Sequence, residues 1–251
     1  MNAPATSNVH LPASEPAQSA LEIAGLQAWY GESHILHDVN ISVRQGEVVT
    51  LLGRNGAGRT TTLRAIMGLT GARKGSIRIN GKEAIGLPTH RIAHLGVGYC
   101  PEERGIFSSL STEENLLLPP ALKTDAKGMS VDEIYEMFPN LKERRNSQGT
   151  RLSGGEQQML AVARILRTGA RLLLLDEISE GLAPVIVQGL ARMIRTLKAR
   201  GYTIVMVEQN FRFAAPLADR FYVMEHGQIV ETFAASELNA KMPVLTELLG
   251  V

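Results

Sequence analysis

The sequence contains little cysteine, few aromatic residues and almost no excess of charge. Among its 251 residues the one cysteine is Cys100, which rules out an internal disulfide or a zinc site of several thiolates and is typical of a reducing compartment. Only 5% of the residues are aromatic, too few and too scattered for a platform on which single-stranded bases stack. The net charge is +1, with no dense basic run to neutralise a row of phosphodiesters. We therefore expect no nucleic-acid partner.

Long apolar runs are also missing. No stretch reaches the roughly 18 to 20 apolar residues that a membrane-spanning helix needs, because the clusters at Leu116–Leu122 and Leu172–Leu175 are short. Residues 1–20 carry prolines among small residues and lack the basic start and apolar middle of a secretion signal. We expect a flexible N-terminal extension, no signal peptide and no transmembrane segment, so that any membrane role requires other subunits.

Short apolar segments that alternate with helical patterns make up most of the chain. Buried or half-buried strands are expected at 21–29, 35–43, 47–52, 172–175, 202–207 and 221–224. Helical periodicity is expected at about 60–68, 131–138, 154–167 and 184–201. Strands alternating with helices predict an α/β core with a largely parallel sheet, and the stretch 111–168 predicts a mostly helical insertion into it.

A glycine-rich segment follows the apolar run 47–52 and has the spacing of a phosphate-binding loop. Backbone N–H groups of such a loop converge on a phosphate, and the helix after it adds the positive end of its dipole. The hydroxyl of Thr60 is placed to bind Mg²⁺. Glycine turns can be purely structural, but the strand before and the helix after favour a nucleotide site. We assign to it Gly53, Arg54, Asn55, Gly56, Ala57, Gly58, Arg59, Thr60 and Thr61.

A pair of acids, Asp176 and Glu177, closes the apolar segment Leu172–Leu175. A strand that ends in acids holds the carboxylates in place, and here they would lie beside the phosphate loop. We predict that Asp176 and Thr60 bind Mg²⁺ and that Glu177 polarises the attacking water. Two acids after a strand are by themselves typical of a solvated turn, so this interpretation depends on the loop upstream.

A third motif begins a long helical pattern. Ser153 is predicted to cap that helix, and two glycines in its first turn would leave backbone amides open to an anion. A capped helix without a ligand is the simpler interpretation, but each glycine costs roughly 1 kcal/mol relative to alanine, which favours a function. Because the first loop already holds phosphates, we predict contact with ATP bound to another chain. The assigned residues are Ser153, Gly154, Gly155, Glu156 and Gln157.

With these three motifs, residues 21–251 resemble the nucleotide-binding subunits of ABC transporters. The resemblance implies an α/β P-loop NTPase core, an antiparallel β subdomain, an inserted helical subdomain at about 108–168, and hydrolysis of ATP with Mg²⁺. Further motifs make the resemblance more specific, to the LivF-type proteins of branched-chain amino acid uptake. These are Pro101-Glu102, Thr112-Glu113-Glu114-Asn115-Leu116, Met137-Phe138-Pro139, Glu180-Gly181-Leu182-Ala183-Pro184 and Val207-Glu208-Gln209-Asn210.

The resemblance also implies partners and a place in the cell. It implies a bacterial importer in which the chain lies on the cytoplasmic face of the inner membrane, bound to membrane permeases. A periplasmic substrate-binding protein would deliver a branched-chain amino acid or a related small amide. The second ATPase subunit would be either another copy of this chain or a LivG-like protein.

Three further site residues are carried over from the resemblance. Tyr30 matches the aromatic residue that stacks on adenine, although a core tyrosine is the alternative. Glu102 stands where most ABC ATPases have a glutamine that senses the metal, and Gln209 stands where most have a switch histidine. The resemblance implies a catalytic role for both and metal binding for Glu102.

One departure concerns Arg59, because a phosphate loop normally carries lysine there. Positive charge is retained, but a planar guanidinium and a compact ammonium are not interchangeable in a tight site. We expect the chain to hydrolyse ATP. Two alternatives stay open: a nucleotide-gated partner subunit with little hydrolysis, and an ABC ATPase that remodels nucleic acid or ribosomes without a permease.

Overall fold

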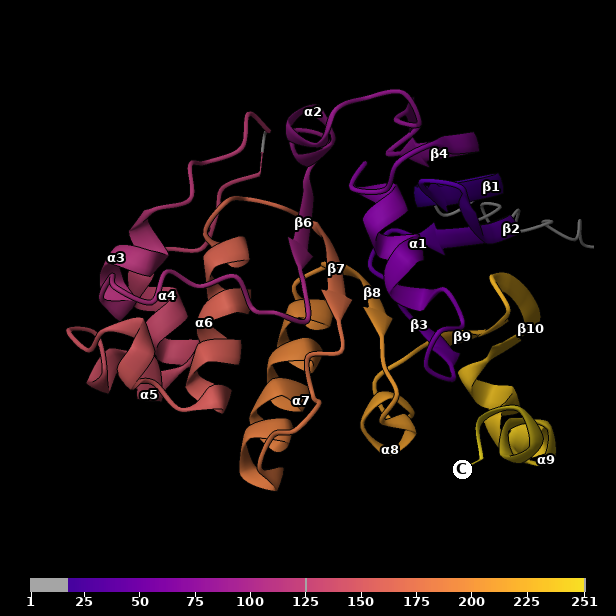
Figure 1. Cartoon of the computed structure of the whole chain (residues 1–251). Helices are drawn as coiled ribbons and strands as arrows, with labels where there is room; N and C mark the ends of the chain where they lie inside the picture. Colours follow the sequence, from indigo (N-terminus) through magenta and orange to yellow (C-terminus); the bar gives the residue numbers. More distant parts are fainter. Residues whose placement is uncertain (1–17, 125, 251) are drawn as a thin grey trace, which may run out of the picture.

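A six-stranded sheet forms the centre of the computed structural model, which describes residues 18–124 and 126–250 (Figure 1). Its strand order is β10-β9-β3-β8-β7-β6, and all neighbours except β10 and β9 run parallel. β3, β7 and β8 are buried along their whole length, as their apolar sequences predict. The strands are β3 (Val48–Gly53), β6 (Val97–Cys100), β7 (Leu172–Asp176), β8 (Thr203–Val207), β9 (Arg220–Glu225) and β10 (Gln228–Ala234).

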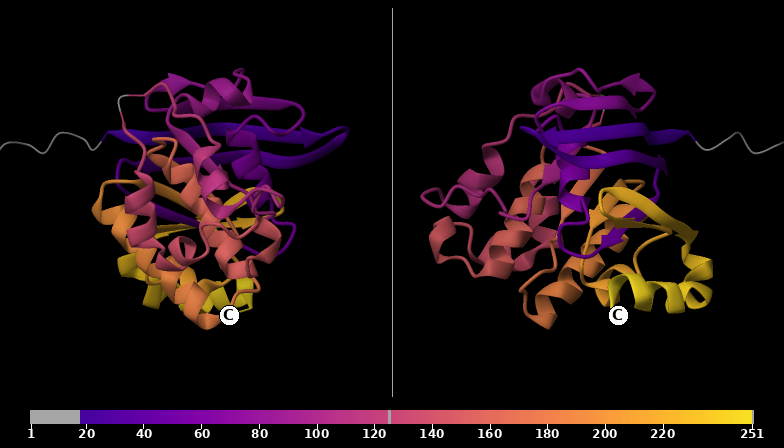
Figure 2. Two further views of the ribbon diagram at one scale, coloured as in Figure 1. Left: turned by 90° about the vertical axis from the view of Figure 1, so that its left-hand side faces the viewer. Right: turned by 45° about the vertical axis from the view of Figure 1, so that its right-hand side comes forward.

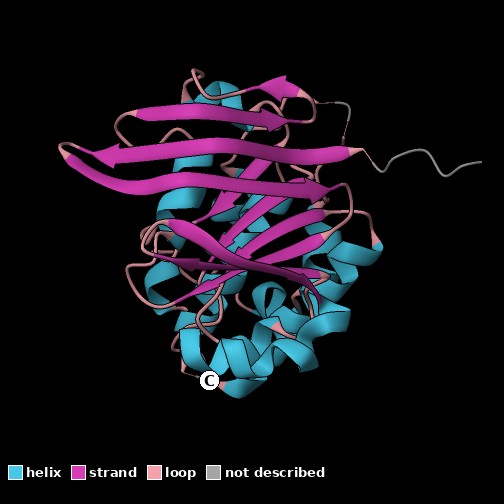
Figure 3. Ribbon diagram, turned by 90° about the vertical axis from the view of Figure 1, so that its right-hand side faces the viewer, coloured by secondary structure: helices cyan, strands magenta, loops and turns pink. Residues whose placement is uncertain are grey.

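A second, antiparallel sheet stacks on the first, as Figure 3 shows from the side. Its strand order is β2-β1-β4-β5. The helix α1 (Arg59–Ile66) lies between the sheets, with Leu63 and Ile66 buried among apolar residues of both. The strands are β1 (Ser19–Tyr30), β2 (Ser33–Arg44), β4 (Arg73–Ile79) and β5 (Lys82–Glu83). The sequence predicted β1 and β2 but neither β4 nor β5, where apolar residues are few.

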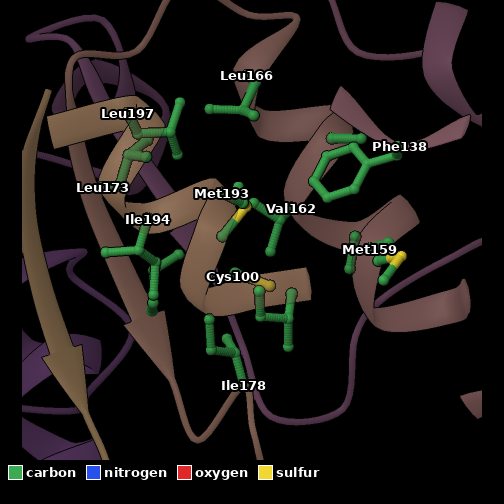
Figure 4. Close-up of a cluster of buried hydrophobic side chains, with 14 of the residues drawn as sticks. Cys100, Phe138, Met159, Val162, Leu166, Leu173, Ile178, Met193, Ile194 and Leu197 are labelled. Carbon is green, nitrogen blue, oxygen red and sulfur yellow. The ribbon is translucent and has the colours of Figure 1, made fainter. Parts of the chain in front are cut away.

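The helices between β6 and β7 form the predicted insertion, which lies at the left-hand end of the molecule in Figure 1 and in the right view of Figure 2. α6 packs against α7 and the sheet through a large apolar cluster that includes Phe138, Val162 and Ile194 (Figure 4). Helices cover more than half of 111–168, as expected, and the described residues between α3 and α4 form loops and bends. The insertion holds α3 (Thr112–Leu117), α4 (Val131–Met137), α5 (Pro139–Glu143), the short 3₁₀ helix η1 (Gly149–Arg151) and α6 (Gly154–Leu166).

Prolines explain the break in helical structure between α3 and α4. Pro119 and Pro120 directly follow the last turn of α3, and proline lacks the N–H that would continue a helix and restricts the residue before it. Leu117 and Leu118, at the end of α3, are exposed.

The remaining helices flank the sheets. α7 (Pro184–Ala199) buries the predicted stripe positions Leu190, Ile194 and Leu197. The others are α2 (Thr89–Ala93), α8 (Phe211–Ala214), the 3₁₀ helix η2 (Ala235–Glu237) and α9 (Leu238–Leu249), none of which the sequence predicted. In the two described ranges, the helices are too short or too polar to cross a membrane.

The N-terminal extension predicted for residues 1–20 ends earlier than expected. Ser19 and Ala20 already belong to β1, and Ala20 is buried. The rest of the predicted extension, residues 1–17, lies outside the described residues. This architecture has the predicted α/β core, antiparallel β subdomain and helical insertion.

Close packing of β6 against α6 gives a test of the fold. A Cβ atom on Gly98 would lie 2.0 Å from Cγ2 of Ile165 and 3.0 Å from Cβ of Ala170. We expect Gly98→Ala to lower the free energy of unfolding by about 1–3 kcal/mol, because overpacking forces the helix away from the strand. Denaturant unfolding measures the loss. Gly86→Ala is the control, since nothing lies within 4 Å of its added Cβ, and equal stability of both variants would contradict this packing.

Candidate active site

The predicted phosphate loop joins β3 to α1. Gly58 precedes the helix with φ 105°, no side chain caps the first turn, and no acid stands in it. The amides of that turn are therefore left for an anion. A Cβ on Gly53 would lie 2.6 Å from the Met224 carbonyl oxygen, and one on Gly58 would lie 2.9 Å from Cδ2 of Leu36. These glycines are required by packing as well as by the approach of a ligand.

A cavity of about 470 Å³ opens on this loop and collects most of the predicted residues. Tyr30 is 38% exposed at its edge, so it is not a core tyrosine. A second cavity of about the same size, between α4, α5 and α7, carries none of the predicted site residues. The lining of the first consists of Tyr30, Ile35, Asn55, Gly56, Ala57, Gly58, Arg59, Thr60, Thr61, Glu102, Glu177 and Glu180.

Asp176 lies fully buried at the end of β7 and accepts two hydrogen bonds. Thr60 Oγ1 donates to its Oδ1 at 3.0 Å, and the Tyr99 hydroxyl donates to its Oδ2 at 3.0 Å. Burial raises the pKa of Asp176, and the bond from Thr60 lowers it. Thr60 and Asp176 are thus adjacent, as a shared metal ion requires. Sequence reasoning missed Tyr99, although its place at the end of a strand beside β7 was a usable signal.

Glu177 forms an ion pair with Arg59 across the loop. Arg59 Nη2 donates to Glu177 Oε1 at 2.8 Å, and the Arg59 side chain is only 4% exposed. Glu177 adopts φ 47°, an uncommon backbone conformation for a residue other than glycine. Burial raises the pKa of Glu177 to about 7, and the charge of Arg59 opposes that shift. A carboxyl group with a pKa in this range can accept a proton near neutral pH.

The same side chains fit the predicted cofactors. Arg59 Nη1 is buried and has no hydrogen-bond partner among the described residues, as expected of a donor that faces a phosphate. The carboxylates of Glu102, Glu177 and Glu180 place ligand atoms within 4.8 Å of one another, and oxygen ligands suit Mg²⁺. The donor set of this cavity therefore fits a nucleotide phosphate with a hard cation.

The third motif lies at the start of α6 and does not line this cavity. Ser153 caps α6 as predicted: its Oγ accepts from the Glu156 N–H at 3.3 Å, and Glu156 Oε2 accepts from the Ser153 N–H at 2.7 Å. The side chain of Gln157 accepts from Arg104 Nη1 and donates to the Gly149 carbonyl. One subunit alone therefore does not bring this motif to the phosphate loop.

Helix packing requires a glycine at position 155, which the sequence did not reveal. A Cβ there would lie 2.7 Å from Cγ1 of Ile186 in α7, whereas one on Gly154 would meet only the flexible guanidinium of Arg104 at 3.3 Å. The argument that both glycines need a ligand is therefore weakened for Gly155, because helix packing already requires it.

Gln209 lies in a neighbouring cavity of about 300 Å³, of which Glu177 and Glu180 also form part of the wall. Beside it, Glu208 is 1% exposed and accepts from the Ser179 hydroxyl at 2.7 Å and from the Ser179 N–H at 3.3 Å. Burial raises the pKa of Glu208 to about 8. This pair links the end of β8 to the loop after Glu177. Sequence reasoning assigned Glu208 no role of its own, although it directly follows a buried strand.

Arg54, which the sequence assigned to the nucleotide site, and Cys100 do not line the cavity that opens on the phosphate loop. The side chain of Arg54 turns away from the cavity and bonds to α9. Cys100 is buried, and burial raises the pKa of its thiol to about 12, as suits a packed side chain.

Comparison with known proteins identifies the class of protein that this fold and site define. Residues 36–180 match the ABC transporter family, so the chain belongs to that family and is an ATP-binding cassette ATPase. Among relatives, it is 44% identical to the high-affinity branched-chain amino acid transport ATP-binding protein BraG of Pseudomonas aeruginosa, over 86% of this chain and 94% of that protein.

Other relatives point in two directions. The chain is 34% identical to the probable branched-chain amino acid transport ATP-binding protein LivF of Archaeoglobus fulgidus, over 87% of this chain and 93% of that protein. It is also 34% identical to the lipopolysaccharide export system ATP-binding protein LptB of Haemophilus influenzae, over 85% and 90%. Nucleotide binding is common to all of them, whereas the transported molecule differs.

Solved structures share the fold. A nucleotide-free ATP-binding cassette from an ABC transporter superposes with a TM-score of 0.79 at 22% identity, over 92% of this chain and 97% of that one. A bacterial ABC transporter cassette in dimeric form superposes with a TM-score of 0.74 at 22% identity, over 86% and 98%. At such identity the likeness concerns the fold alone.

The Gly155 contact separates helix packing from ligand binding. We expect Gly155→Ala to lower the free energy of unfolding by about 1–3 kcal/mol without any nucleotide present, because Ile186 must move. Gly154→Ala is the matched control and should change it by less than about 1 kcal/mol, or raise it, since alanine favours a helix. Urea titration of both variants measures this. Two equally stable variants would remove the packing explanation.

Glu208 gives a pH-dependent prediction. The folded chain holds its proton up to about pH 8, whereas the unfolded chain releases it near the ordinary value of about 4.5. The stability that the protonated Glu208 side chain contributes is therefore fully present below about pH 4.5, and it is lost as the pH rises through 8. Relative to Glu208→Gln, the wild type should lose on the order of 4 kcal/mol between about pH 5 and about pH 9. Denaturant titrations at several pH values measure it, and parallel profiles would show that Glu208 titrates normally.

Proposed function

We propose that this chain is the ATP-hydrolysing subunit of a bacterial importer for branched-chain amino acids or related small amides. The 44% identity to BraG supports this substrate class more than the 34% identity to LptB supports export. The motifs shared with LivF-type proteins support it as well. The observation that carries the catalytic part is that Arg59, Thr60 and Glu177 line one cavity, where Arg59 pairs with Glu177 and Thr60 bonds to the buried Asp176.

Different residues of the cavity carry out different parts of the reaction. The amides of Gly53 to Thr60 and the free Nη1 of Arg59 hold the phosphates, and Tyr30 stacks on adenine. Glu177 accepts a proton from the water that attacks the terminal phosphorus atom, and the bond to the leaving ADP oxygen breaks. Glu102 and Gln209 orient the metal and the water. Mg²⁺, held by Thr60 and Asp176, would neutralise charge that develops on the phosphate oxygens.

The site is completed by a second subunit. The motif Ser153–Gln157 stands apart from the phosphate loop of its own chain, so its open helix start is available to the nucleotide of a partner. The partner is a second copy or a LivG-like subunit, and the dimeric cassette of the same fold supports this arrangement.

A membrane permease binds on the helical insertion, at the cytoplasmic face of the inner membrane. Phe107, Leu117 and Leu118 are about half exposed between β6 and β7, and exposed large apolar side chains are available to a partner protein. A periplasmic substrate-binding protein would feed the permeases from the opposite side.

Hydrolysis is tested by phosphate release from three proteins. Wild type should release phosphate from Mg-ATP, and Glu177→Gln should lose at least about 100-fold in turnover while it retains ATP, because the amide cannot accept the proton. Arg59→Lys keeps the positive charge and should still hydrolyse, which tests the alternative of a partner subunit with little turnover.

The outcomes separate the two candidate functions. ATP retention by wild type and Arg59→Lys without phosphate release from either would contradict the enzyme and favour the nucleotide-gated partner subunit. The transported molecule is tested separately, by uptake of labelled leucine and of labelled urea in cells that lack this chain. Unchanged uptake of both would contradict the proposed substrate class.

A further inference from the structure

The second residue of the phosphate loop points away from the nucleotide cavity. Arg54 Nε donates to the Leu248 carbonyl at 2.9 Å, and Arg54 Nη2 donates to the Glu247 carbonyl at 3.2 Å. The Arg54 side chain lines a separate cavity of about 220 Å³ with Leu248, and Asn55, Gly56 and Ala57 line both cavities. The loop is therefore a wall between the nucleotide cavity and the end of α9.

The end of α9 is suited to receive this cation. The last carbonyl groups of a helix lack N–H partners within the helix and carry the negative end of its dipole. α9 has no basic residue in its last turn and ends at Gly250, whose φ is 76°. Arg54 thus supplies from the loop the positive charge that the helix does not carry itself.

A second contact fixes α9 to the same stretch of chain. Leu245 of α9 is fully buried in an apolar cluster with Leu52, Phe221 and Phe233. Leu52 comes directly before Gly53 and Arg54, where β3 ends near α9 in Figure 1. The helix α9 therefore contacts the start of the loop in two ways, through the buried side chain of Leu245 and through the hydrogen bonds of Arg54.

We infer that Arg54 is a positioning residue, through which the C-terminal helix α9 holds the phosphate loop in its nucleotide-binding shape. The inference rests on the proposed role of that loop. This clamp consists of the contacts between Arg54 and α9. Without it, binding of the nucleotide would have to order the loop, and the cost of that ordering would reduce the affinity. The C-terminal helix, far from the phosphate loop in sequence, thereby contributes to nucleotide affinity.

Simple charge attraction is the rival explanation, since any cation near the loop would attract a phosphate. Variants of Arg54 distinguish the two. Arg54→Ala removes the charge and the hydrogen bonds, whereas Arg54→Lys keeps the charge but offers one nitrogen in place of the fork. We expect the dissociation constant of ADP to rise about two- to fivefold in Arg54→Ala and to rise measurably in Arg54→Lys.

The helix side of the clamp can be changed without touching the loop. Gly250→Ala strains only the last turn of α9, because nothing lies within 4 Å of the added Cβ and the left-handed φ is unfavourable for alanine. Gly201→Ala is the matched control, since Gly201 has φ 77°, equally open surroundings and a place after α7. Gly250→Ala should weaken ADP binding, and Gly201→Ala should leave it unchanged.

Titration calorimetry of the full-length chain with ADP measures these constants, and thermal unfolding checks that each variant is folded. In the double variant Arg54→Ala/Gly250→Ala the two effects should be less than additive, because both break one contact. Arg54→Lys equal to wild type, additive effects, or equal affinities of the Gly250→Ala and Gly201→Ala variants would each overturn the inference. Absence of ADP binding by the wild type would instead contradict the proposed function of the loop.

Discussion

The site depends on the meeting of two chain segments at the carboxyl edge of the parallel sheet. Arg59 and Thr60 follow β3, and Asp176 and Glu177 end β7, with β8 between the two strands. Because all three strands run parallel, their carboxyl ends lie at one edge, and the two pairs of side chains come within hydrogen-bond distance. The cavity, the exposed ring of Tyr30 and the carboxylate of Glu102 are arranged around this contact.

Burying carboxyl groups at this edge of the sheet is unfavourable, and nearby hydrogen-bond donors offset that free-energy cost. Asp176 and Glu208 are almost completely buried, and isolated carboxylates in such surroundings would be strongly destabilised. Thr60 and Tyr99 donate to the first, and Ser179 donates twice to the second. Arg59 is buried, with Nη2 on Glu177 and with Nη1 lacking a hydrogen-bond partner among the described residues, so a phosphate oxygen fits as the acceptor for Nη1.

Elements with a strong local pattern could be predicted from the sequence, and elements without one could not. β3, β7 and β8 are apolar throughout, and α7 carries a clear stripe, so all four were expected. β4 has few apolar residues and pairs with β1 across many intervening residues, while α9 contains Pro243 in its interior. In such segments tertiary contacts outweigh local propensity.

The sequence by itself determined the kinds of chemistry present: a glycine loop, an acidic strand end and a capped helix start, each encoded by a few adjacent residues. Only the tertiary structure decided which side chains meet, as when Arg59 pairs with Glu177 and Arg54 turns to α9. The physical reason is that these partners are more than a hundred residues apart, and their contact follows from strand order and helix packing. No local pattern of residue types records such a contact.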